Sequence, residues 1–241
     1  LLAGLSVPAH SESPTVYVAL EPEGENYSFF GRRIAASTGE RREVREYRRI
    51  ACETVVDHSH AKHSHLGGRP YMVGSLARLH HWADRLSPLA QAVAREIGLR
   101  LPTENVLYNN HAQAVELVWS LERAAEVIEG LLETGLQEET APRVEWSEPR
   151  QGTAATEVPR GTLYHHYEFD AHGRVTAADI ITPTAQNLAN VEKDLRACAE
   201  RLLGRPEEEL VANFEMIVRA YDPCISCSVH LIHADRKARM P

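Results

Sequence analysis

The side chains with the greatest chemical potential lie near the C-terminal end, in the segment DPCISCSVH at residues 222–230. Two thiols, Cys224 and Cys227, are followed closely by the imidazole of His230. Thiolate and imidazole ligands suit nickel, zinc and iron far better than magnesium or calcium. The Cys-x-x-Cys spacing lets both sulfurs face one ion. The segment therefore predicts a bound metal.

On the residues alone, other interpretations of this segment stay open. Together with His233, it offers four ligands that could hold a structural zinc ion. The gap between the thiols and the imidazoles is shorter than in ordinary zinc fingers. A redox dithiol would normally open a helix after a strand, whereas this pair follows an expected helix. A last interpretation is that these thiols and imidazoles lie on the surface and have no function.

Composition limits the class of protein. The chain has 241 residues, 43% of them hydrophobic and 25% charged, which fits one or two globular domains. The net charge of -8 argues against general nucleic-acid binding, and no apolar run reaches the ~18 residues that a membrane span needs. The remaining thiols, Cys52 and Cys198, lie in apolar-patterned segments, so we expect both to be buried.

The elements that position the metal-binding segment can be read from periodicity. Residues 1–60 are β-rich, with strands expected at 15–20, 27–30 and 33–36. Helical spacing of leucine and alanine begins at Ser75, and Ser87-Pro88 caps a second helix that stops at Gly98. Pro102 and Thr103 open a longer helix whose continuous apolar stripe ends near Gly135.

The second half of the chain contains a β excursion. Residues 137–156 are expected to be a loop, and residues 162–181 a hairpin with a polar turn at 170–173. Two further helices, one closed by Gly204 and one opened by Pro206, lead into Cys224. The fold class is therefore mainly α with an antiparallel β excursion, an α+β fold. The expected divisions are a β-rich segment at 1–60, a helical core with the metal motif at 61–230, and a tail at 231–241.

Four segments in this order resemble the large, catalytic subunit of [NiFe]-hydrogenases. They are GRPYMVGSLAR at 68–78, EVPRG at 157–161, TPTAQN at 182–187 and the C-terminal DPCISCSVH. The resemblance covers roughly residues 55–230. The residues of its motifs are most similar to those of cytosolic, multi-subunit enzymes coupled to NAD(P) or F420. It implies a helical bundle core, a cytoplasmic location and reversible oxidation of H2.

The resemblance also implies roles for individual residues. Cys224 would be a terminal nickel ligand and a proton acceptor, and Cys227 would bridge nickel to an iron that carries CO and cyanide. Arg160 would place its guanidinium over the open side of the metals; without the resemblance it would be an ordinary ion-paired arginine. Pro159 would line the pocket for diatomic ligands. Thr184, otherwise a turn residue, would donate a hydrogen bond to a cyanide.

Maturation and assembly follow from the same resemblance. His230 would end the mature subunit and, with the backbone carbonyl of Ile180, bind a magnesium ion. Residues 231–241 would be an extension removed by a dedicated endopeptidase after metal-insertion chaperones have loaded nickel; otherwise they form a basic tail. Electrons would pass to an iron–sulfur small subunit and on to carrier-reducing subunits, because this chain has no spare cysteines for a cluster.

Two features fall outside this pattern. The family's first cysteine pair, in an Arg-x-Cys-Gly-x-Cys segment, has no match here, and the chain begins with Leu1. We therefore expect it to be the C-terminal part of a longer subunit. The histidine run His58, His60, His63 and His65 is interpreted as a relay or a solvated loop rather than a second metal site.

Overall fold

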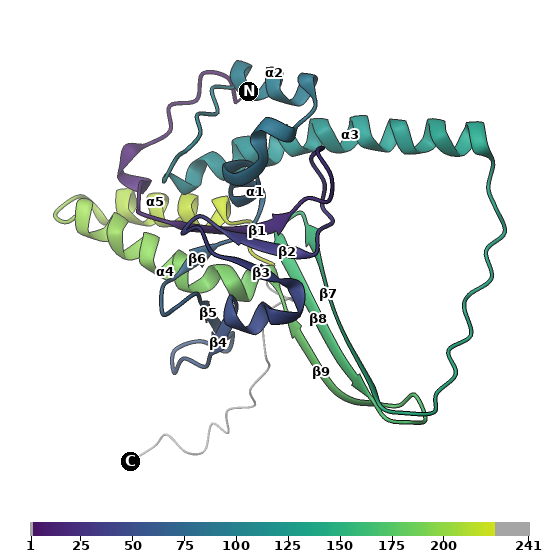
Figure 1. Cartoon of the computed structure of the whole chain (residues 1–241). Helices are drawn as coiled ribbons and strands as arrows, with labels where there is room; N and C mark the ends of the chain where they lie inside the picture. The colour runs from purple at the N-terminus through teal and green to yellow at the C-terminus, as the bar shows by residue number, and fades with distance from the viewer. Residues whose placement is uncertain (1, 225–241) are drawn as a thin grey trace, which may run out of the picture.

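The computed structural model describes residues 2–224, and its centre is a four-stranded sheet (Figure 1). The strand order is β3-β2-β1-β6; β1, β2 and β3 pair antiparallel, and β6 runs parallel to β1. The strands are β1 (Val16–Glu21), β2 (Arg33–Ala36), β3 (Arg41–Glu43) and β6 (Tyr71–Met72).

Two smaller sheets flank this centre, a two-stranded sheet and an antiparallel sheet in the order β7-β8-β9. Their strands are β4 (Cys52–Thr54), β5 (His63–His65), β7 (Arg150–Val158), β8 (Gly161–Phe169) and β9 (Val175–Ile181). The predicted hairpin turn is confirmed. The Asp170 carboxylate accepts hydrogen bonds from the backbone N–H groups of His172 and Arg174, at 2.8 and 2.9 Å. These bonds hold the turn in the way typical of aspartate.

The helices are α1 (Ser75–Trp82), α2 (Pro88–Glu96), α3 (Asn109–Thr134), α4 (Pro183–Arg201) and α5 (Glu207–Ala220). The predicted N-cap of α2 is confirmed, because the Ser87 hydroxyl accepts from the N–H of Ala90 at 3.2 Å. Thr182 caps α4 in the same way. The predicted end of α3 is also confirmed, since Gly135 follows it with a positive φ of 72°.

The core has two hydrophobic clusters. One lies among α1, α2, α3, α4 and α5 and one face of the central sheet. The other consists largely of strand residues, such as Val18, Leu20 and Ile34, packed with Tyr47 and Tyr164. The α+β class is therefore confirmed, but helices alone do not make the core of the described chain.

Three expected elements differ from the structure. Residues 27–30 do not form a strand. The side chain of Tyr27 turns inward to the Glu116 carboxylate, and the backbone N–H of Tyr27 donates to the carbonyl of Arg85. The third helix begins at Asn109 rather than Pro102, since the side chain of Asn105 accepts from Leu107 and caps a short 3-10 helix instead. The polar residues 150–156 belong to β7, which is defined by its pairing with β8 and not by an apolar pattern.

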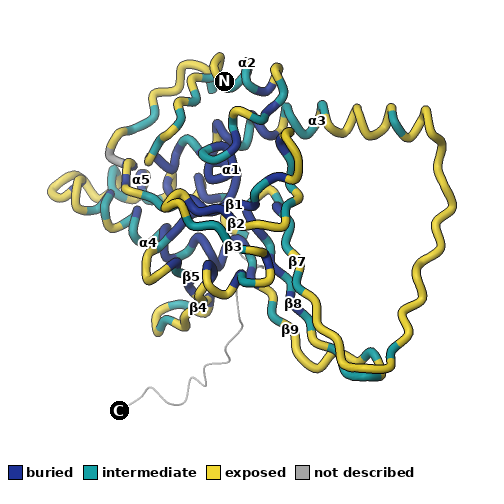
Figure 2. Tube along the Cα trace, in the orientation of Figure 1, coloured by how far each residue is buried: buried dark blue, intermediate teal, exposed yellow. Residues whose placement is uncertain are grey.

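The apolar stripe of α3 is a further difference. Val115 is buried, but the outer half of the helix extends away from the body of the molecule and is coloured mostly as exposed in Figure 2. Leu117, Leu121, Ile128 and Leu132 are exposed. The periodicity therefore predicted the helix correctly, whereas nothing in the described chain covers its outer apolar face.

The two remaining thiols differ in their burial. Cys198 is buried, as predicted. Cys52 is exposed, and its Sγ donates to the carbonyl of Arg48 at 3.1 Å. The prediction for Cys52 was wrong because its strand, β4, lies in a two-stranded sheet that leaves one side in solvent.

Burial of His81 on α1 makes stability depend on pH. Its Nε2 donates to the carbonyl of Tyr17 at 3.1 Å, and burial lowers its pKa from 6.5 to about 4. Between these values the folded state binds fewer protons than the unfolded state, so stability falls as the pH falls. Going from about pH 7 to about pH 5 should cost about 2 kcal/mol through this residue.

Denaturant unfolding of the wild type and of His81→Gln at both pH values measures this contribution. The glutamine keeps an N–H donor for Tyr17 but cannot titrate. We expect its stability to fall less than that of the wild type over the same interval. Equal losses in the two proteins would show that His81 does not carry the effect.

Candidate metal centre

The turn between β7 and β8 is tied to the segment that carries Cys224. The Nε of Arg160, in this turn, donates to the carbonyl oxygen of Asp222 at 2.7 Å and lies 3.1 Å from its carboxylate Oδ2. The Nε2 of Gln113, on α3, donates to the same carboxylate oxygen at 3.4 Å. Asp222 has a positive φ of 49°, a conformation that aspartate tolerates better than most residues. These contacts fix the backbone two residues before the thiol.

The first turn of α4 reaches Cys224 directly. Thr184 is buried there, and its Oγ1 accepts a hydrogen bond from the backbone N–H of Cys224 at 3.2 Å. A hydroxyl that accepts one hydrogen bond still has its own proton to donate. The N-terminal end of a helix also carries partial positive charge. This end of α4 therefore favours a negatively charged group beside Cys224.

A close backbone contact joins the β7–β8 turn to the start of α1. Gly161 has φ of 137°, and a Cβ at this position would lie 2.3 Å from Cγ2 of Val73. Gly74 has φ of 114°, and its Cβ would lie 3.0 Å from the carbonyl oxygen of Arg160. Only glycine combines this φ with so close an approach. The two glycines let the GRPYMVGSLAR and EVPRG segments touch.

Two side-chain amides of α4 hold these segments in place. The side chain of Asn187 accepts from the N–H of Val73 at 2.9 Å and donates to its carbonyl at 3.4 Å. The neighbouring Gln186 donates to the carbonyl of Thr162 at 2.6 Å and accepts from the hydroxyl of Tyr71 at 3.2 Å. Both side chains are buried, so α4 positions the start of α1 and the beginning of β8 together.

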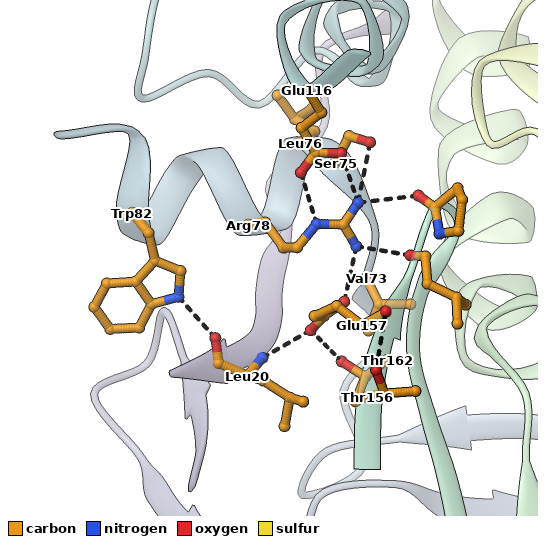
Figure 3. Close-up of polar contacts among 12 residues, drawn as sticks. Leu20, Val73, Ser75, Leu76, Arg78, Trp82, Glu116, Thr156, Glu157 and Thr162 are labelled. Atoms are coloured by element: carbon orange, nitrogen blue, oxygen red, sulfur yellow. Dashed lines mark hydrogen bonds and ion pairs between the residues drawn. The ribbon is translucent and has the colours of Figure 1, made fainter. Parts of the chain in front are cut away.

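Arg78, on α1, contacts the turn between β7 and β8 within a buried ion network (Figure 3). Its guanidinium lies between the carboxylates of Glu116, on α3, and Glu157, on β7, at 2.6 and 2.8 Å. It also donates to the carbonyls of Val158 and Pro159, each at 3.0 Å. All three charged side chains are at most 6% exposed. The network fixes the turn that presents Arg160.

Burial and neighbouring charges shift the pKa values of the residues in this network. Burial alone would lower the pKa of Arg78, but Glu116 and Glu157 raise it well above its usual value, so the guanidinium stays charged. Burial and the negative charge of Glu116 raise the pKa of Tyr27, whose hydroxyl donates to that carboxylate. The second carboxylate, Glu157, also accepts from the N–H of Leu20 and the hydroxyl of Thr162, at 2.8 and 2.7 Å.

The structure brings most of the expected site residues together. Cys224 and Arg160 are half-buried, Thr184 is buried, and Pro159 is exposed beside them. Ile180 lies on β9, paired with His165, and is 47% exposed. The predictions for Cys227, His230, His233 and residues 231–241 concern residues outside the described part of the chain.

Several positioning roles were not predicted from the sequence, notably those of Arg78, Gly74 and Asn187, which lie in the motif segments, and of Glu116, which does not. The available signal was a charged side chain inside an apolar run, since Arg78 lies between Ala77 and Leu79. A buried arginine requires carboxylate partners, but the sequence does not show which of its many glutamates supply them.

Comparison with known proteins gives a consistent result. A family model described as nickel-dependent hydrogenase matches residues 23–230. Sulfhydrogenase 1 subunit alpha of Pyrococcus furiosus is 41% identical over 96% of this chain and 54% of that protein. The NAD-reducing hydrogenase HoxS subunit beta of Cupriavidus necator is 30% identical over 94% of this chain and 49% of that protein.

Solved structures show the same fold. An NAD⁺-reducing [NiFe]-hydrogenase in the H2-reduced state matches 92% of this chain and 52% of that chain, with a TM-score of 0.74 and 27% identity. The Ni-Fe-Se hydrogenase of D. vulgaris Hildenborough has a TM-score of 0.62 at 22% identity, a likeness of fold alone. The chain spans about half the length of the curated relatives it matches. Among the described residues, no helix has the length and apolar character needed to cross a membrane.

Proposed function

The chain belongs to the nickel-dependent hydrogenase family, and on this premise we propose that it is the C-terminal part of a catalytic subunit that interconverts H2 with protons and electrons. One observation carries the proposal. Segments that are far apart in the sequence meet around Cys224, where the hydroxyl of Thr184 contacts its backbone and Arg160 binds the preceding Asp222. A metal centre whose surrounding residues come from several loops requires such contacts between distant segments.

The donor set fits nickel and iron. Thiolate ligands suit these metals, and Cys224 and Cys227 would hold them in the terminal and bridging roles that the family resemblance implies. When bound, the nickel–iron group, with CO and cyanide on iron, supplies the redox chemistry that cleaves H2. The sulfur of Cys224 accepts the proton. Arg160 would act as a fixed cation, because Asp222 anchors its guanidinium.

The surrounding residues complete this arrangement. Pro159 would line the approach to the metals, and the Thr184 hydroxyl would donate a hydrogen bond to a cyanide on iron. His230 and the carbonyl of Ile180 hold magnesium. The helical bundle core of the family would include α1, α3, α4 and α5 of this chain.

Processing, partners and location belong to the same proposal. The extension at 231–241 is removed after His230 by a maturation endopeptidase, once metal-insertion chaperones have acted. Residues 1–60 form the β-rich segment and residues 61–230 the helical core with the metal motif. Electrons leave through an iron–sulfur small subunit to carrier-reducing subunits in the cytoplasm. Family membership weighs against the zinc-binding module of Cys224, Cys227, His230 and His233.

The native subunit, purified without oxygen from its source, tests the proposal. We expect equimolar nickel and iron, H2-dependent reduction of a dye, and an intact mass whose C-terminus is His230. A subunit that contains zinc but no nickel, and that keeps residues 231–241, would contradict the proposal and favour the zinc module.

A further inference from the structure

The histidine run between β4 and β5 meets a carboxylate from α4. The Nε2 of His58 lies 2.6 Å from Oε1 of Glu192, and the Nε2 of His63 lies 3.6 Å from the same oxygen. The two imidazole rings are 5.7 Å apart and nearly perpendicular, at 80°. One ligand atom from each of the three residues lies within 4.8 Å of the others. The sequence did not indicate this meeting, because Glu192 is far from the histidines along the chain.

We propose that His58, His63 and Glu192 form a second metal site, separate from the Cys224 centre, that binds a divalent transition metal ion such as Zn²⁺. Two imidazole nitrogens and one carboxylate oxygen are a typical ligand set for zinc sites that keep one open position. Magnesium and calcium prefer oxygen ligands, so a set in which two of the three donors are imidazole nitrogens favours a transition metal. Water would complete the coordination, since the His58 and Glu192 side chains are 62% and 44% exposed.

The distances require little movement. Zinc–ligand bonds of about 2.0–2.1 Å place the donors around a tetrahedral ion about 3.3 Å apart. The two measured separations from Glu192 Oε1, 2.6 and 3.6 Å, lie on either side of this value. Small rotations of exposed side chains are enough to close the difference.

Two of the three ligands are held by regular structure. His63 is buried on β5, where it pairs with Thr54, whose hydroxyl donates to its carbonyl at 3.2 Å. Glu192 lies on α4, which packs against β5. Only His58 comes from a loop.

The position of the site suggests what the ion does. Glu192 belongs to the same helix as Thr184, the residue that contacts Cys224. An ion bound by His58, His63 and Glu192 would join the β4–β5 hairpin to α4 and hold this helix in place. The second site would therefore stabilise the structure around the first one without taking part in its chemistry.

A zinc titration of the full chain tests the site. The host is the Cys224→Ser, Cys227→Ser double variant, which removes the thiol ligands near the C-terminus. Isothermal titration calorimetry with Zn²⁺ alone should show one ion bound per chain. His58→Ala and Glu192→Gln, both at exposed positions, should each weaken binding by at least about tenfold.

Matched controls separate this site from general binding. His60→Ala changes another exposed histidine of the same loop, and Glu200→Gln another exposed glutamate of α4. We expect both to bind Zn²⁺ within about twofold of the host, and Zn²⁺ to raise the Tm of the host more than that of Glu192→Gln. Equal affinity in all variants, or competition by equimolar Mg²⁺, would overturn the proposal and leave adventitious binding only.

Discussion

Replacing Arg78 by methionine should lower the free energy of unfolding by about 3–5 kcal/mol, because Glu116 and Glu157 would remain buried without their cation. Methionine fills a similar volume, so the loss would report charge and hydrogen bonds rather than a cavity. Denaturant unfolding at neutral pH measures it. The turn that holds Arg160 would also lose two donors, those to the carbonyls of Val158 and Pro159.

Two further variants make the Arg78 prediction decisive. Arg123→Met breaks an exposed pair with Glu126 and should cost at most about 1 kcal/mol. Adding Glu116→Gln and Glu157→Gln to Arg78→Met removes both orphaned charges and should recover part of the lost stability. If Arg78→Met proves no more damaging than Arg123→Met, the buried network does not hold the turn as the geometry indicates.

The second large effect is expected at the proposed metal centre. Cys224→Ser in the native subunit should reduce both nickel content and H2-dependent activity by more than about 100-fold. Loss of a hydrogen bond around a metal typically costs about 10–100-fold, and loss of a ligand should cost more. Metal analysis and H2-dependent dye reduction measure the two quantities.

Cys52→Ser is the matched control for Cys224→Ser. Cys52 is also a thiol outside the core, but it lies on β4, where its Sγ donates to the carbonyl of nearby Arg48. This variant should keep full nickel content and activity. If Cys224→Ser retains nickel, Cys224 is not a ligand, and the proposed division of roles between the two thiols fails.

Local features of the fold were predictable because their causes are local. Ser87 caps its helix and Asp170 closes its hairpin turn through bonds to residues at most four positions away. Tyr27 and Cys52 were misjudged because their burial depends on distant partners. The aromatic content of residues 27–30 favours a strand, yet the side chain of Tyr27 turns inward to the Glu116 carboxylate.

The candidate site was predictable only in part. The resemblance identified Cys224, Arg160 and Thr184, and the structure places these residues near one another. It did not indicate that Asp222 anchors Arg160, or that Asn187 clamps Val73. Such contacts join residues far apart in the chain, and periodicity carries no information about them. The apolar stripe of α3 is a similar case, since it predicts a helix but not what packs on it.

The order of residues at the centre has a consequence for biosynthesis. Thr184 precedes Cys224 by 40 residues, and Arg160 precedes Asp222 by 62. A ribosome makes the chain from the N-terminus, so Val73, Arg160 and Thr184 leave it before the thiol does. Domains begin to fold during synthesis. The residues that contact this segment are therefore translated before Cys224, and their contacts with it can form only once translation has passed Cys224.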